Sequence, residues 1–149
     1  MFYEQIREVH VLGTRYLPKR SRGRHSSAVC AYWPAVGGRI SLTCDQLRVG
    51  IIQYFVRHTV SLCSPDSHSQ QSKTHLFAFV FWYQTHPRER WFHPRIRVLS
   101  PDMVMNGPAT FLPISRTHGS CTLISERVKF DYGEDYVVVS VMLSNKFFV

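Results

Sequence analysis

Two long β-prone segments dominate the pattern of apolar and polar positions along the chain. Residues 47–60, LRVGIIQYFVRHTV, are rich in β-branched and aromatic side chains, which predicts a long, bent strand with Gly50 as a bulge or bend site. Residues 64–74 are polar and predict an exposed loop. Residues 75–84, HLFAFVFWYQ, predict a second long strand, so the whole region is expected to form a long hairpin.

Side chains alternate between the two faces of a strand, and residues 75–84 carry an apolar set on each face. One set is Phe77, Phe79, Phe81 and Tyr83, and the other is Leu76, Ala78, Val80 and Trp82. Because both faces are apolar, this strand is expected to lie in the centre of its sheet.

The remaining pattern is of shorter strands separated by turns. The segments 28–33, 96–99, 110–114 and 120–124 are short and β-prone. Residues 135–143, DYVVVSVML, have the strongest β-propensity and follow the strand ERVKF across a turn at 132–134, which predicts a terminal hairpin. Since no amphipathic helix of ten residues is visible, the sequence predicts a single small all-β domain, either a barrel or a sandwich.

The N-terminal part differs from the rest in composition. A length of 149 residues suits one domain. Residues 15–24, RYLPKRSRGR, hold five basic side chains among Pro, Ser and Gly, a composition typical of a linker. We therefore expect residues 1–27 to be a flexible basic arm and residues 28–149 to be the β-rich domain.

Composition limits the class of protein. Apolar residues make up 44% of the chain, with ten Phe, seven Tyr and three Trp, so global disorder is excluded. The net charge is +8, which permits an acidic partner such as nucleic acid. No apolar run has the roughly 18–20 residues of a membrane-spanning helix, and the first ten residues have no signal-peptide core. We expect a soluble intracellular protein that does not interact with membranes.

Candidate chemistry is sparse. The four cysteines at 30, 44, 63 and 121 form no CxxC pair, so free thiols are expected. Cys63 with His68, and His118 with Cys121, lack the standard spacing of zinc ligands, and no metal site is predicted. There is no nucleophile–base signature and no phosphate-binding glycine loop. We expect neither a cofactor nor enzymatic activity.

Several central segments share features with one known family. These are Gly50 to Ile52, FAFVFWY at 77–83, the loop to Trp91, VLSPDM at 98–103 and FLPISRTHGSC at 111–121. Together they resemble a bromo-adjacent homology domain, and similar stretches occur in transposon-associated proteins. The resemblance covers residues 28–125. It implies a non-enzymatic, β-rich module of nuclear, chromatin-associated proteins that binds histone tails, nucleosomes or other proteins.

The chain departs from this family beside the aromatic strand. Acidic residues that are often present there are replaced by Arg88, Arg90, Arg95 and Arg97. Because histone tails are themselves basic, this replacement favours nucleic acid as the ligand.

Two groups of residues are candidates for contacting nucleic acid. The basic group would neutralise phosphates and consists of Arg15, Lys19, Arg20, Arg22, Arg24, Arg88, Arg90, Arg95 and Arg97. The aromatic group would stack on unpaired bases and consists of Trp82, Tyr83, Trp91 and Phe92. Against these roles, the arm is also typical of a solvated linker or nuclear-import signal, and the aromatic side chains of core packing.

The sequence thus predicts an interaction module in a nuclear or mobile-element setting, with nucleic acid as its ligand. Two alternatives stay open. The first is a protein-binding reader or scaffold that recognises a histone tail or another chromatin protein. The second is a fragment of a larger transposon-derived protein without independent activity. The oligomeric state also stays open.

Overall fold

The computed structural model describes residues 2–11, 14–19, 27–33, 47–63, 70–87 and 96–142. Within these ranges the chain is an all-β domain, which confirms the predicted fold class. The strands are β1 (Phe2–Ile6), β2 (Val9–Val11), β3 (Thr14–Tyr16), β4 (Ala28–Tyr32), β5 (Leu47–Cys63), β6 (Gln70–Thr85), β7 (Ile96–Val104), β8 (Phe111–Pro113), β9 (Thr117–Phe130) and β10 (Gly133–Met142). Single turns of 3-10 helix, η2 (Pro108–Thr110) and η3 (Ile114–Arg116), flank β8. No helix in these ranges is both long enough and apolar enough to cross a bilayer.

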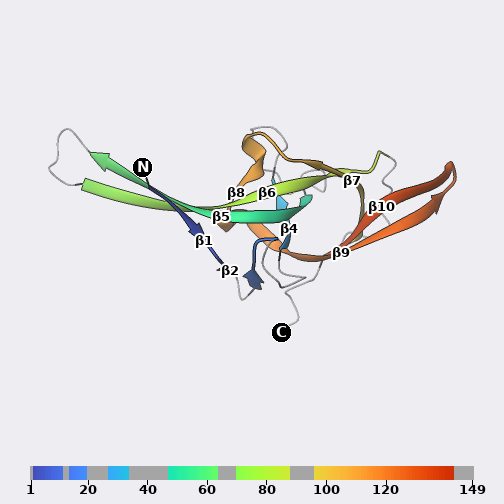
Figure 1. The fold of residues 1–149 in the computed structure, drawn as a ribbon, viewed down its shortest axis with the longest axis horizontal. Helices are drawn as coiled ribbons and strands as arrows, with labels where there is room; N and C mark the ends of the chain where they lie inside the picture. The colour runs from blue at the N-terminus through green and yellow to red at the C-terminus, as the bar shows by residue number, and fades with distance from the viewer. Residues whose placement is uncertain are drawn as a thin grey trace.

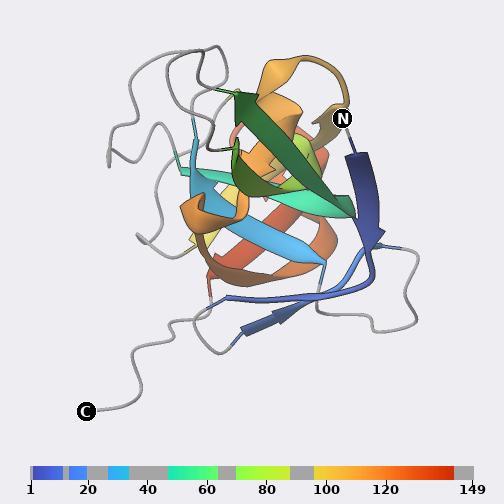
Figure 2. The ribbon, with the colours of Figure 1, turned by 90° about the vertical axis from the view of Figure 1, so that its left-hand side faces the viewer.

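The main sheet closes on itself. Its antiparallel pairings run β5–β4–β9–β10–β7–β6, and a further pairing of β6 with β5 completes the ring. Figure 2 views this ring along the long axis of the molecule. Strands β1 and β8 extend the sheet beyond the ring, since β1 pairs with β5 and β8 pairs with β6.

Two hairpins project from the ring in opposite directions (Figure 1). The predicted long hairpin is confirmed as β5–β6, although its strand pairing continues as far as Cys63 and Gln70, into the segment expected to be a loop. The predicted terminal hairpin is confirmed as β9–β10. Its turn is Asp131–Tyr132. The next residue, Gly133, has a φ of 133°, a backbone conformation that residues with a side chain rarely adopt.

Apolar side chains form two cores on opposite faces of the curved sheet. The interior core fills the ring and consists of Ala28, Cys30, Leu47, Val49, Leu99, Cys121 and Val138. The outer core lies on the other face and consists of Val9, Tyr16, Val29, Ala31, Ile52, Phe55, Ala78, Val80, Trp82 and Leu112. Strand β4 contributes alternate residues to both cores, which explains why it is almost entirely apolar.

The N-terminal segment is not the flexible arm that its composition suggests. Strand β1 pairs with β5 over its whole length, and β2 pairs with β3. Val9 and Tyr16 are buried in the outer core, at 7% and 2% exposure. Burial of these two apolar side chains stabilises the segment against the domain, even though the basic residues around and after Tyr16 have the composition of a linker. Residues 20–26, which hold most of the basic cluster, lie outside the described residues.

Gly50 has a different role from the predicted one. The irregularity in the β5–β6 pairing falls between Ile52 and Tyr54, not at Gly50. Gly50 lies directly opposite Trp82, and a Cβ atom there would lie 2.5 Å from Val80 Cγ1 and 2.7 Å from the Phe81 carbonyl oxygen. Glycine is therefore needed because the neighbouring strand approaches closely.

Candidate functional site

Only some of the predicted basic residues lie in the described part of the chain. Arg15 is exposed, and its guanidinium donates two hydrogen bonds to Glu8 Oε2 at 2.9 and 2.6 Å. Lys19 is exposed, whereas Arg97 is buried at 3% exposure, so Arg97 does not reach a surface ligand. The others fall outside the described residues: Arg20, Arg22, Arg24, Arg88, Arg90 and Arg95.

The predicted aromatic surface is wrong for Trp82. This side chain is fully buried in the outer core, and its indole N–H donates to the Ala109 carbonyl at 2.7 Å. Tyr83 is half-buried and packs against the interior core, and this burial raises the pKa of its phenol. Trp91 and Phe92 lie outside the described residues.

An aromatic surface does exist, on the opposite face of β6 from Trp82. Three of its rings come from directly paired positions on neighbouring strands, because Tyr54 pairs with Phe79 and Phe79 pairs with Phe111. Phe77 and Phe81 are the next residues on the same face of β6. We call these residues the aromatic face: Tyr54, Phe77, Phe79, Phe81 and Phe111.

The rings of the aromatic face contact one another and remain partly open to solvent. Tyr54 and Phe79 stack, with centroids 4.8 Å apart and planes at 13°. Phe79 meets Phe111 edge-on at 5.0 Å and Phe81 edge-on at 5.6 Å. Phe111 is 43% exposed, and the other four rings are half-buried. The row therefore presents aromatic surface to solvent.

The same face continues toward the tip of the β5–β6 hairpin. Strand pairing places Val56 beside Phe77, His58 beside His75, Val60 beside Lys73 and Leu62 beside Gln71. Leu62 is 58% exposed. At the other side of the row, where β1 meets β5, an open pocket of about 320 Å³ is lined by Glu4, Gln5, Tyr54, Phe55 and Val56.

Charge is unevenly distributed between the two hairpins. Strands β5, β6 and β8 and the turn η3 carry Arg48, Arg57, Lys73 and Arg116, and none of their residues is acidic. Strands β9 and β10 and their turn carry Glu126, Asp131, Glu134 and Asp135 against Arg127 and Lys129. These hairpins point to opposite ends of the molecule (Figure 1). We call the part formed by β5, β6, β8 and η3 the basic side, and the aromatic face lies on it.

Two of the basic residues on this side have local roles. Arg57 pairs with Glu4 of β1 at 2.7 Å. The Arg48 guanidinium lies over the Trp82 ring at 4.9 Å, and burial lowers the pKa of Arg48. Lys73 and Arg116 are the exposed cations that remain among the described residues of β5, β6, β8 and η3.

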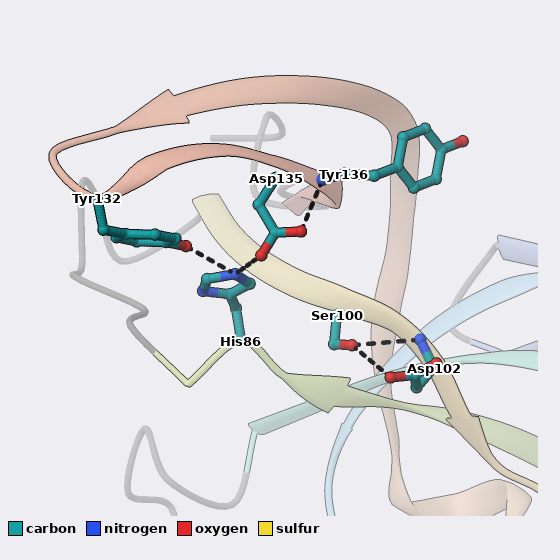
Figure 3. Close-up of polar contacts among 6 residues, drawn as sticks. All are labelled: His86, Ser100, Asp102, Tyr132, Asp135 and Tyr136. Carbon is teal, nitrogen blue, oxygen red and sulfur yellow. Dashed lines mark hydrogen bonds and ion pairs between the residues drawn. The ribbon is translucent and has the colours of Figure 1, made fainter.

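A second polar cluster joins the end of β6 to the β9–β10 hairpin (Figure 3). His86 Nε2 lies 3.0 Å from Asp135 Oδ2 and 3.3 Å from the Tyr132 hydroxyl, and the His86 ring stacks on Phe130 at 5.1 Å. The hydrogen bond from His86 holds the pKa of Asp135 below its ordinary value. The hydroxyl of Ser100 donates to Asp102 rather than to this cluster. The arrangement ties the hairpin to the ring.

The cysteines and histidines do not gather into a site in the described residues, where no group of three or more metal-ligating side chains occurs. Burial raises the pKa of Cys30 to about 12 and that of Cys121 to about 11. His118 packs edge-on against Tyr32 at 5.0 Å. His68 lies outside the described residues, and so does the side chain of Cys63.

Comparisons with known proteins add no relative. A scan of family models, a search of curated proteins and a search of solved structures each found no match. The resemblance to bromo-adjacent homology domains stays a prediction.

The sequence carries part of the signal for the aromatic face. The alternation in residues 75–84 puts Phe77, Phe79 and Phe81 on the opposite face of the strand from Trp82. Because each face carries apolar side chains, the pattern indicates that either face can be buried and does not show which one stays open to solvent. Which face stays open depends on β2, β3 and η2, which cover the Trp82 side, and on the length by which β6 extends past the ring.

Proposed function

We propose that the protein is a non-enzymatic interaction module that binds nucleic acid on the aromatic face. The observation that carries this proposal is the row of Tyr54, Phe79 and Phe111, in register on three neighbouring strands whose own residues include no acid. Nucleic acids offer the two matching chemistries, anionic phosphates for the basic residues and aromatic bases for the rings.

Energetic considerations support this ligand class. Stacking of one base on an aromatic side chain contributes about 1–3 kcal/mol, and the net charge of +8 favours approach of a polyanion. A cluster of large apolar side chains that stays partly open to solvent is also typical of a surface that binds a partner. A nuclear or mobile-element setting rests on the resemblance to bromo-adjacent homology domains and is part of the proposal.

A protein-binding reader or scaffold is the second candidate. Leu62 and Phe111 are 58% and 43% exposed, and between their positions the face holds more apolar than charged side chains. An apolar segment of a partner protein would bury such a strip. Binding of this kind would tolerate salt, whereas phosphate contacts weaken steeply as salt rises.

The proposed function is tested by fluorescence anisotropy of labelled oligonucleotides with the full chain across a salt series. A Lys73→Glu/Arg116→Glu variant replaces two exposed cations of β6 and η3 and leaves the ion-paired Arg57 in place, and Arg127→Glu/Lys129→Glu makes the same charge change on the opposite hairpin. We expect the first variant to lose most of its affinity and the second to lose less. Equal losses, or no binding by the unmodified chain at low salt, would contradict the proposal.

A further inference from the structure

Resting on the proposed function, we propose that the aromatic face stacks on unpaired bases, so that the ligand is single-stranded nucleic acid. The carrying observation is the row formed by Tyr54, Phe79 and Phe111, which pair directly across β5, β6 and β8. Neighbouring strands lie about 4.8 Å apart, so the row spans roughly 10 Å across the sheet. That width is enough for two or three bases.

The two ends of the row are the accessible parts. Phe111 is the most exposed ring of the aromatic face, at 43%. At the other end, Tyr54 lines the open pocket between β1 and β5. The central ring, Phe79, already contacts Tyr54 on one side and Phe111 on the other. Bases therefore stack first on Phe111 and Tyr54, with Phe79 holding both rings in place.

A duplex does not match this surface. The faces of paired bases are covered by their neighbours in the stack, and a protein reaches them only by unstacking or flipping them. The described cations of the basic side are also few, since Lys73 and Arg116 are the exposed ones that carry no ion pair in the structure. If these two side chains each contact one phosphate of a single strand, the logarithm of the binding constant should fall with the logarithm of the salt concentration with a slope of about −1.4.

A peptide that adds a strand to the sheet does not match the row either. Phe79 lies between β5 and β8, so the backbone of β6 is paired on both sides at this position. A ligand over the row is held by side chains, as an unpaired base is by stacking. The basic surroundings leave an acidic peptide as the competing occupant, which the experiment includes.

The experiment measures anisotropy of a labelled oligothymidylate of about twelve nucleotides, within the range covered by one small nucleic-acid-binding barrel. Three further probes are an abasic strand of the same length, a duplex of the same length and a labelled glutamate–tyrosine copolymer. Phe111→Ala removes the exposed ring and Phe111→Tyr retains one. Tyr136→Ala removes a ring of similar exposure, 49%, from the opposite hairpin.

We expect the single strand to bind more tightly than the abasic strand and the duplex. Phe111→Ala should weaken single-strand binding by roughly 5- to 150-fold, while Phe111→Tyr and Tyr136→Ala stay near the unmodified chain. Equal binding of all three nucleic acids, with no effect of Phe111→Ala, overturns this inference but leaves the proposed function standing. Binding of the acidic copolymer without binding of any oligonucleotide overturns both.

Discussion

Phe79 and Trp82 leave the same strand in opposite directions. Trp82 is fully buried in the outer core and bonds to Ala109 of η2, while Phe79 lies half-buried in the middle of the aromatic face. The three-residue separation puts them on different faces of β6. Core and candidate binding surface are thus built on a single strand, and mutations on the two faces should have separable effects.

Replacing Trp82 should affect folding and not ligand contact. Trp82 and Trp33 both donate their indole N–H groups to the Ala109 carbonyl, at 2.7 and 2.9 Å. Trp82→Phe removes a buried donor and leaves a void, with an expected loss of about 2–4 kcal/mol in the free energy of unfolding. Trp33→Phe, at a half-buried position, should cost about 1 kcal/mol. Urea unfolding followed by circular dichroism measures both, and similar losses for the two variants would contradict this account.

Gly50→Ala should destabilise the β5–β6 pairing. The added methyl group would meet Val80 Cγ1 at 2.5 Å and the Phe81 carbonyl oxygen at 2.7 Å, and the latter belongs to backbone that cannot rotate away. We expect a loss of about 1–3 kcal/mol in the free energy of unfolding. Ser125→Ala, at an exposed position of β9, is the control and should leave the midpoint unchanged. An unchanged midpoint for Gly50→Ala would show that the strands are free to separate.

The Asp135–His86 contact should make stability depend on acid pH. The hydrogen bond from His86 lowers the pKa of Asp135 from its ordinary value of 3.8. Because the pKa of Asp135 is lower in the folded state than in the unfolded state, the ionised carboxylate stabilises the folded state fully above about pH 4. This stabilisation is lost as the pH falls through the folded-state pKa. Between neutral pH and pH 3 the melting temperature of the unmodified chain should fall further than that of Asp135→Asn. Parallel melting curves over this range would refute the proposed linkage.

The buried thiols should be unreactive in the folded protein. Burial raises the pKa of Cys30 to about 12 and that of Cys121 to about 11, so little thiolate is present at pH 8. In a Cys44→Ser/Cys63→Ser variant, a thiol reagent such as Ellman's reagent should react slowly in buffer and fully in denaturant. Rapid reaction in buffer would mean that the interior core opens readily.

The parts of the fold that follow from local pattern could be predicted from the sequence. The β5–β6 and β9–β10 hairpins each join β-rich runs that are near neighbours in the chain. Residues 15–24 were misleading, because basic residues in a row resemble a linker whether or not Val9 and Tyr16 are buried nearby. The complete aromatic face could not be predicted from the sequence, because Phe111 joins Tyr54 and Phe79 only through the β6–β8 pairing, which links distant parts of the chain.

The most direct test of the central claim is to map where nucleic acid contacts the protein. An oligonucleotide containing a photoreactive thiothymidine is crosslinked to the full chain, and the modified residues are located by mass spectrometry. We expect crosslinks at Tyr54 and Phe111, and their loss when an unlabelled single strand competes. Crosslinks confined to Tyr132 and Tyr136 on the opposite hairpin would contradict the assignment of the aromatic face as the nucleic-acid-binding surface.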